Sequence, residues 1–222
     1  MARILDGLKS WIAQDRRRVA IVAAFDSWLT VANINRGLSD ERLLTQERGA
    51  GLIPGEAASA VVVQADEGLF DGTYMKIAGV GLADEAASFT SGRLGAGVGL
   101  SKAIRAALAE SGAEANEINL RLANVTGEDY FFVESSYAWT RVLRQLSPLD
   151  YRYQIIDSAI GSVGSAFGPL GIGHAMQRSE FLGKNQKVLL QLSSAGPSRS
   201  AIVGEIVEGM LEEIVNEPET SR

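Results

Sequence analysis

The segment 161–177, "GSVGSAFGPLGIGHAMQ", constrains the fold more than any other part of the sequence. Glycine costs about 1 kcal/mol in a helix interior relative to alanine, yet this segment contains Gly161, Gly164, Gly168, Gly171 and Gly173. Its apolar residues nevertheless keep the spacing of a helix, which favours a helix over a mobile glycine loop. Glycines are tolerated in a helix where backbones approach closely. The segment therefore predicts a central helix that lies between two sheets and touches a second helix, with Pro169 beginning or kinking it.

The rest of the chain alternates between helix and strand patterns. Apolar spacing predicts helices over 2–14, 100–111 and 129–146. Strands are expected over 19–25, 58–64, 74–83, 118–125 and 153–157, and a final hairpin over 187–194 and 199–208. The continuous apolar run 19–25 is typical of a strand covered on both faces, and the strands 58–64 and 74–83 can form a hairpin. This order predicts one layered α/β domain over 1–207, followed by an acidic tail, 208–222.

Composition excludes several classes of function. The sequence contains no cysteine, so these 222 residues encode no disulfide, thiolate metal site or cysteine nucleophile. The net charge is −6, and no basic block is longer than Arg16–Arg18, which argues against binding of nucleic acid. No apolar run approaches the roughly 20 residues that span a bilayer. The first residues also lack the apolar core of a signal peptide. We therefore expect a cytoplasmic protein that does not enter a membrane.

Six motifs occur in an order that matches a known family. They are "VAIVAAFDS" (19–27), "GAGLIPGEAASAVVV" (49–63), "YMKIAGVGLA" (74–83), "LANVTGED" (122–129), "SAIGSVGSAFGPLGI" (158–172) and "VLLQLSSAGPSRSAIV" (188–203). In order and spacing the chain resembles the carboxy-terminal portion of a divergent β-ketoacyl-acyl-carrier-protein synthase (3-oxoacyl-ACP synthase), a family of the thiolase-like superfamily. The resemblance implies an α/β fold of the layered αβαβα type. It is incomplete here, with the carboxy-terminal half and only the end of the amino-terminal half.

The resemblance also implies where the family's Cys-His-His site would fall. The nucleophile would lie a few residues before Met1, at the start of the helix that "ARILDGLKSW" continues. The first histidine position falls on or near Asn124, and the second falls on Ser162. Neither residue can carry a proton near neutral pH as an imidazole does. The chain is therefore expected to have no catalytic residues of its own.

These substitutions leave three hypotheses for function. The first is a ketosynthase-like binding or assembly component without condensing activity by itself. The alternative is an acyltransferase whose nucleophile lies upstream of Met1 or on a partner chain. The third is a fragment without function. For the first two, the resemblance implies a homodimer or a complementing half-domain chain, with acyl carrier protein as a further partner. No cofactor or metal is expected.

The remaining polar residues are interpreted as structural. Glu56 is expected to be a buried carboxylate held by backbone donors at the turn before a strand. The single histidine, His174, is interpreted as a packed, hydrogen-bonded residue of the glycine-rich helix. Glu128, Asp129 and Glu134 are interpreted as acids favoured at a helix amino terminus, not as a metal site.

Overall fold

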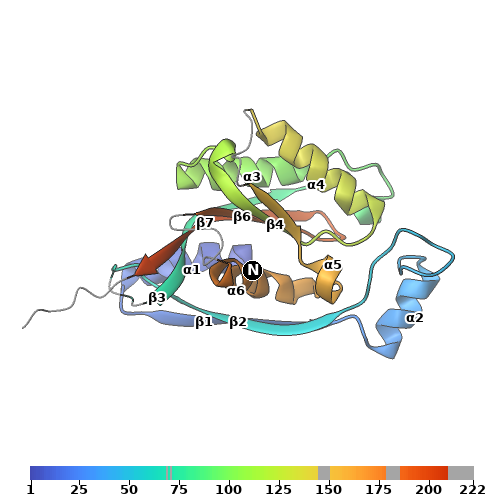
Figure 1. The fold of residues 1–222 in the computed structure, drawn as a ribbon, viewed down its shortest axis with the longest axis horizontal. Helices are drawn as coiled ribbons and strands as arrows, with labels where there is room; N and C mark the ends of the chain where they lie inside the picture. The colour runs from blue at the N-terminus through green and yellow to red at the C-terminus, as the bar shows by residue number, and fades with distance from the viewer. Residues whose placement is uncertain (69, 71, 145–150, 179–185, 210–222) are drawn as a thin grey trace, which may run out of the picture.

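The computed structural model describes residues 1–68, 70, 72–144, 151–178 and 186–209, and these form two sheets and several helices (Figure 1). The elements in chain order are α1 (Ala2–Gln14), β1 (Val19–Ser27), α2 (Val31–Ser39), β2 (Glu56–Gln64), β3 (Gly72–Asp84), η1 (Phe89–Ser91), α3 (Val98–Ser111), η2 (Ala115–Glu117), β4 (Ile118–Ala123), α4 (Asp129–Val142), β5 (Arg152–Ile155), α5 (Asp157–Ile160), η3 (Gly164–Ala166), α6 (Phe167–Gln177), β6 (Lys187–Ser193) and β7 (Ser198–Gly209). The predicted helices and strands are present, although α4 ends earlier than expected. The expected tail lies almost wholly outside the described residues.

The larger sheet has five strands in the order β3-β7-β6-β4-β5. The strands β5, β4 and β6 run parallel to one another, whereas β7 is antiparallel to both β6 and β3. The predicted final hairpin is therefore confirmed as β6–β7. The predicted hairpin of 58–64 with 74–83 is wrong, because β2 pairs with β1 while β3 crosses to the larger sheet and pairs with β7.

The smaller sheet consists of β1 and β2, paired antiparallel from Val19 opposite Gln64 to Ser27 opposite Glu56. Side chains alternate between its two faces, so Val22 is buried on the inner face while Ile21 and Phe25 are exposed on the outer one. The prediction that 19–25 is covered on both faces is wrong for the described residues. No helix among them packs on the outer face of this sheet.

The elements form layers that match the incomplete layered fold predicted from the sequence. Figure 1 shows α3 and α4 above the larger sheet, α1 and α6 between the two sheets, and β1 with β2 below. One core lies between the sheets around Leu5, Phe167 and Leu190, and a second lies under α3 and α4 around Ile104 and Trp139. No helix in the described part of the chain has the length and apolarity needed to cross a bilayer.

The glycine-rich segment contains the predicted central helix, but the helix is shorter than the segment. Gly161 and Gly164 precede it, with φ angles of 78° and 52° that favour glycine. Pro169 lies in the first turn of α6, where its missing N–H is not required. A Cβ on Gly168 would lie 2.5 Å from the Met1 Cβ, so the absence of a side chain lets α6 approach the start of α1. The predicted contact between two central helices is therefore confirmed only at the start of α1, where its N-cap residue Met1 meets Gly168 of α6.

Candidate functional site

The carboxyl ends of the three parallel strands bring the predicted site residues to one edge of the larger sheet. Asn124 follows β4, Ser162 follows β5 and α5, and Ser193 ends β6. In α/β sheets the carboxyl ends of parallel strands are where ligands bind, because the loops there are free to carry polar groups. This edge is the candidate site.

Asn124 holds the ends of two strands together. Its Nδ2 donates to the Ser193 carbonyl oxygen at 2.8 Å, and its Oδ1 accepts from the Ser193 N–H at 2.8 Å. The last paired residues of β4 and β6 are Ala123 and Gln191. The Asn124 amide therefore continues the pairing where the backbone ladder stops. Its oxygen and its nitrogen are both engaged in this structural contact.

Ser162 is buried in a loop that is joined to the turn before β2. Its N–H donates to the Ile53 carbonyl at 2.7 Å, and its carbonyl accepts from the Gly55 N–H at 3.1 Å. A Cβ on Gly55 would lie 2.5 Å from the Ile160 carbonyl oxygen, so only glycine fits between the two loops. The "PGE" turn thus positions the Ser162 loop through Gly55.

Asp157 is a site residue that the sequence reasoning missed. Its side chain is buried near the Ser162 side chain, and its Oδ1 has no hydrogen-bond partner. Burial raises the pKa of Asp157 to about 7, and the nearby Ser162 hydroxyl opposes this only in part. In the sequence, the position of Asp157 directly after a short strand was the signal that could have indicated a site residue. A carboxyl group that titrates near neutral pH can donate or accept a proton.

A buried ion pair fixes the turn between β6 and β7 next to this edge. Arg199 Nε donates to Glu134 Oε1 at 2.8 Å, and both side chains are fully buried. Arg199 also donates to the carbonyls of Ser194 and Gly196 in the turn, at 3.0 and 2.7 Å. Burial and the Glu134 charge raise the pKa of Tyr130, which contacts both partners, to about 12. The tyrosine is therefore a neutral hydrogen-bonding group at physiological pH.

The three acids suggested by the sequence do not converge on one point. Glu128 is the N-cap residue of α4 and forms a two-pronged ion pair with Arg42 at 2.9 and 3.0 Å, and Asp129 lies in the first turn. The helix-terminus interpretation holds for these two, but it is wrong for Glu134, which lies inside α4 opposite Arg199. Within the described ranges, no set of three His, Cys, Asp or Glu side chains is placed to hold a metal ion.

The interpretation of Glu56 as a buried acid held by backbone donors is wrong. Glu56 points to the outer face of β2, is exposed, and accepts a hydrogen bond from Ser27 Oγ at 3.0 Å. Asp26 has the expected role instead, because its carboxylate accepts from the N–H groups of Ser27 and Ser165, each at 2.9 Å. It thereby joins β1 to the loop before α6.

His174 is packed, as predicted. Its Nε2 lies 2.7 Å from Gln154 Oε1 on β5, and burial lowers the pKa of its imidazole. It lies in α6, whereas Asn124 and Ser162 lie in the loops at the carboxyl edge. The neutral imidazole is therefore a structural hydrogen-bonding group between α6 and β5.

The start of α1, next to which the resemblance places the nucleophile, lies beside an open pocket of about 300 Å³. The residues that line it come from α1, β1 and the start of α6: Met1, Ile4, Val22, Ala23, Ala24, Phe25, Ser165 and Pro169. The lining is mostly apolar, and burial lowers the pKa of the Met1 amino group. The pocket suits an apolar group better than a charged one.

Comparisons with solved structures identify the fold. The chain is similar to an oxazolomycin ketosynthase domain from Streptomyces albus (TM-score 0.75, 14% identity, 92% of this chain and 45% of that chain). It is also similar to a β-ketoacyl synthase from Burkholderia phymatum (TM-score 0.70, 16% identity, 93% and 59%). A third similar structure is a ketosynthase in complex with its chain length factor from Xenorhabdus doucetiae (TM-score 0.71, 18% identity, 92% and 57%). No protein-family model matches the chain, and no curated protein matches it.

These comparisons define a class of fold. The chain has the thiolase-like fold of the ketosynthases, as the sequence motifs predicted. It spans about half of the length of the ketosynthase chains that it matches.

Proposed function

We propose that this chain is a ketosynthase-like assembly component that does not form carbon–carbon bonds by itself. The observation that carries the proposal is the state of Asn124. This residue stands at or near the family's first histidine position, and both ends of its amide are committed to the Ser193 backbone. An amide in such a clamp neither carries a proton nor turns toward a substrate.

The other site positions support the same proposal. By the resemblance, Ser162 falls on the second histidine position, and its backbone is bonded to Ile53 and Gly55 at the turn before β2. The sequence contains no cysteine, and its only histidine is engaged with Gln154. Thiolate activation at a helix amino terminus is the physical basis of condensation in this family. These residues provide neither the thiolate nor the imidazoles.

The test is an acyl-transfer assay with the purified chain. The chain is incubated with acyl- and malonyl-thioesters of an acyl carrier protein and analysed by intact-mass spectrometry. We expect no acyl adduct on the chain and no β-ketoacyl product. The Asn124→His and Ser162→His double variant is expected to stay inactive, because it still lacks a nucleophile. Formation of a β-ketoacyl product by the chain alone would overturn the proposal.

One observation favours a second candidate, an acyltransferase whose nucleophile is on another polypeptide. The pKa of Asp157 is raised to about 7 by burial beside Ser162, so its carboxyl group can exchange protons near neutral pH. If a complex with a second polypeptide transfers acyl groups, the Asp157→Asn variant should lower kcat and remove a pH dependence near 7. An unchanged pH profile would exclude this role for Asp157.

The remaining parts of the proposal concern partners and location. Several similar structures are complexes of a ketosynthase with a chain length factor, and one contains a type II polyketide acyl carrier protein. By analogy, we place this chain in a cytoplasmic complex with a partner chain, either as a homodimer or with a complementing half-domain, with acyl carrier protein as a further partner. Size-exclusion chromatography with light scattering distinguishes the two forms.

A further inference from the structure

Four cations gather on the outer side of α3 and α4. Lys102 and Arg105 lie one turn apart on α3, Arg141 lies in the last turn of α4, and Arg144 follows that helix. All four residues are exposed. Arg105 Nη2 donates to the Arg141 carbonyl at 2.6 Å, which joins the two helices. The fold therefore brings together a basic surface that the sequence does not contain as a block.

These four cations lack carboxylate partners. The ion pairs among the described residues join other cations to Asp or Glu, and none includes these four. The carboxylate of Glu110, the single acid in α3, instead accepts from the Val80 N–H of β3 at 2.7 Å. Arg105 and Arg141 donate to backbone carbonyls, which hold a guanidinium in place but leave its charge. The net charge of the sequence is −6, so this surface has the opposite sign to the protein as a whole.

Apolar side chains lie beside the cations. Leu94, in the loop before α3, is 97% exposed, while Tyr137 of α4 and Val98 of α3 are 54% and 40% exposed. The Ala96 carbonyl of the same loop accepts from Arg141 Nε at 3.0 Å, so the loop and the two helices form one surface. Figure 1 shows α3 and α4 as the outermost layer above the larger sheet, with no described helix or strand over them. We call this surface, with its four cations and three apolar residues, the α3–α4 face.

The pattern of the α3–α4 face fits an anionic lipid surface. Apolar and aromatic residues next to Lys and Arg on an exposed helical surface are typical of proteins that lie on a bilayer. The ring of Tyr137 suits the headgroup level, where amphipathic aromatic side chains are enriched. The core of an interface with another protein is usually depleted of charged residues, whereas Lys102, Arg105 and Arg141 lie in the middle of this face. A charge of one sign therefore favours lipid phosphates over a protein partner.

We propose that the α3–α4 face binds the surface of an anionic lipid bilayer. Lys102, Arg105 and Arg141 contact lipid phosphates, and Leu94 and Tyr137 enter the headgroup region. The chain lies on the bilayer and does not cross it. This inference goes beyond the assembly role proposed above and does not depend on it. The acidic residues of the smaller sheet do not oppose binding, because the helix layer between the sheets is about 10 Å thick and the Debye length at physiological salt is about 8 Å.

The test is co-sedimentation of the full chain with vesicles of phosphatidylcholine, with and without phosphatidylglycerol. We expect the chain to bind only the vesicles that contain the anionic lipid. Binding should be lost at about 1 M salt, where the Debye length falls to about 3 Å. Equal binding to both kinds of vesicle, or binding to neither, would overturn the proposal.

A protein partner is tested separately. Acyl carrier protein serves as the acidic protein probe in a calorimetric titration of the chain and of its Lys102→Glu variant. We expect the Lys102→Glu substitution to leave any binding of this probe unchanged. Binding of the probe that the substitution removes, in a chain that does not bind vesicles, would assign the α3–α4 face to a protein and overturn the proposal.

Matched variants locate the contact. Lys102→Glu is expected to weaken vesicle binding about 5- to 25-fold, because it changes the charge by two units and each cation near the lipid contributes roughly fivefold. Leu94→Ser should weaken it about tenfold through the loss of apolar contact. Arg3→Glu is the control, since it makes the same charge change at an exposed position of α1, in the layer between the sheets. Circular dichroism checks that every variant is folded. An equal loss in the control, or no loss in either variant of the face, would refute the assigned surface.

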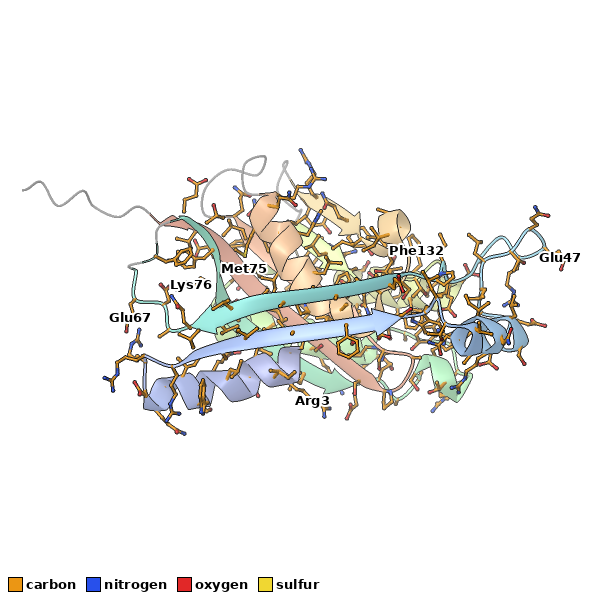
Figure 2. The ribbon with its side chains drawn as sticks, turned by 90° about the horizontal axis from the view of Figure 1, so that it is seen from below. Arg3, Glu47, Glu67, Met75, Lys76 and Phe132 are labelled. Atoms are coloured by element: carbon orange, nitrogen blue, oxygen red, sulfur yellow. The ribbon has the colours of Figure 1, made fainter. Side chains whose placement is uncertain are left out.

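A fluorescent label tests which side of the molecule meets the lipid. Because the chain has no cysteine, the single variants Leu94→Cys and Phe25→Cys each carry one environment-sensitive fluorophore. Phe25 is 84% exposed on β1, and Figure 2 shows the β1–β2 sheet from its outer side, opposite the α3–α4 face. With phosphatidylglycerol vesicles, we expect emission to rise and shift to the blue at position 94 and to stay unchanged at position 25. The same change at position 25 would show that the apolar β1 side meets the lipid, and would overturn the proposal.

Discussion

The Glu134→Gln substitution removes a negative charge that faces the Arg199 guanidinium in the interior. The carboxylate accepts from Arg199 Nε at 2.8 Å, Ser193 Oγ at 2.7 Å and Tyr130 Oη at 3.2 Å. Replacing the charged acceptor by a neutral one costs about 1 kcal/mol of stability for each of these three hydrogen bonds, or about 3 kcal/mol in total. Leaving one member of a buried pair uncompensated costs about 3–5 kcal/mol by a separate argument. We therefore expect the free energy of unfolding to fall by about 3–5 kcal/mol.

Urea unfolding followed by tryptophan fluorescence measures this change. With a slope of about 3 kcal/mol per molar urea, the midpoint should fall by at least about 1 M. In a double-mutant cycle with Arg199→Met, the two losses should sum to more than the loss in the double variant, by about 2 kcal/mol. The control is Glu41→Gln, which breaks the exposed pair with Arg48 and should cost less than about 1 kcal/mol. A Glu134→Gln loss as small as that control would refute the reasoning.

Two further predictions concern the Ser162 loop. Burial raises the folded-state pKa of Asp157 to about 7 from an ordinary value near 4. The Asp157 carboxyl group therefore binds its proton more tightly in the folded protein than in the unfolded chain. As a result, the free energy of unfolding falls as pH rises from about 4 to 7. Asp157→Asn should remove this decline and raise the melting temperature at pH 8 relative to the unsubstituted chain; parallel pH profiles of the two proteins would contradict it. Gly55→Ala should lower the free energy of unfolding by about 1–3 kcal/mol, because the new Cβ meets the Ile160 carbonyl. Gly173→Ala, where a Cβ meets nothing within 4 Å, should be neutral or raise it by up to about 1 kcal/mol. Equal effects of the two glycine substitutions in urea unfolding would show that the contact at Gly55 does not exclude a side chain.

The sequence predicted the helices and strands well because the apolar spacing and end residues that indicate them lie within each element. The apolar positions Leu100, Ala103, Ile104, Ala107 and Leu108 are buried on α3, and Gly112 ends that helix at a φ of 70°. Pairing between distant strands was harder. The pattern of β3 fits a hairpin with β2 as well as a pair with β7, and only the packing of α3 on the larger sheet decides between them.

The sequence singled out two residues of the candidate site. The motif order pointed to Asn124 and Ser162, and the structure has both in loops that follow strands of the larger sheet. That they stand at the family's histidine positions stays a prediction. The sequence did not indicate the Asp157–Ser162 contact or the Glu134–Arg199 pair, because each depends on which side chains become buried together. Glu56 was misjudged for a similar reason. The side chains of a strand point alternately to its two sides, and "GEAAS" alone does not indicate which side is exposed to water.

The start of α1 also has a consequence for handling the protein. Met1 lies against Gly168 and lines the pocket beside β1. Any residues ahead of Met1, whether native or fused, would therefore pass this open pocket between β1 and the start of α6. Varying the length of a fused segment would show how long it must be before α1 is no longer displaced.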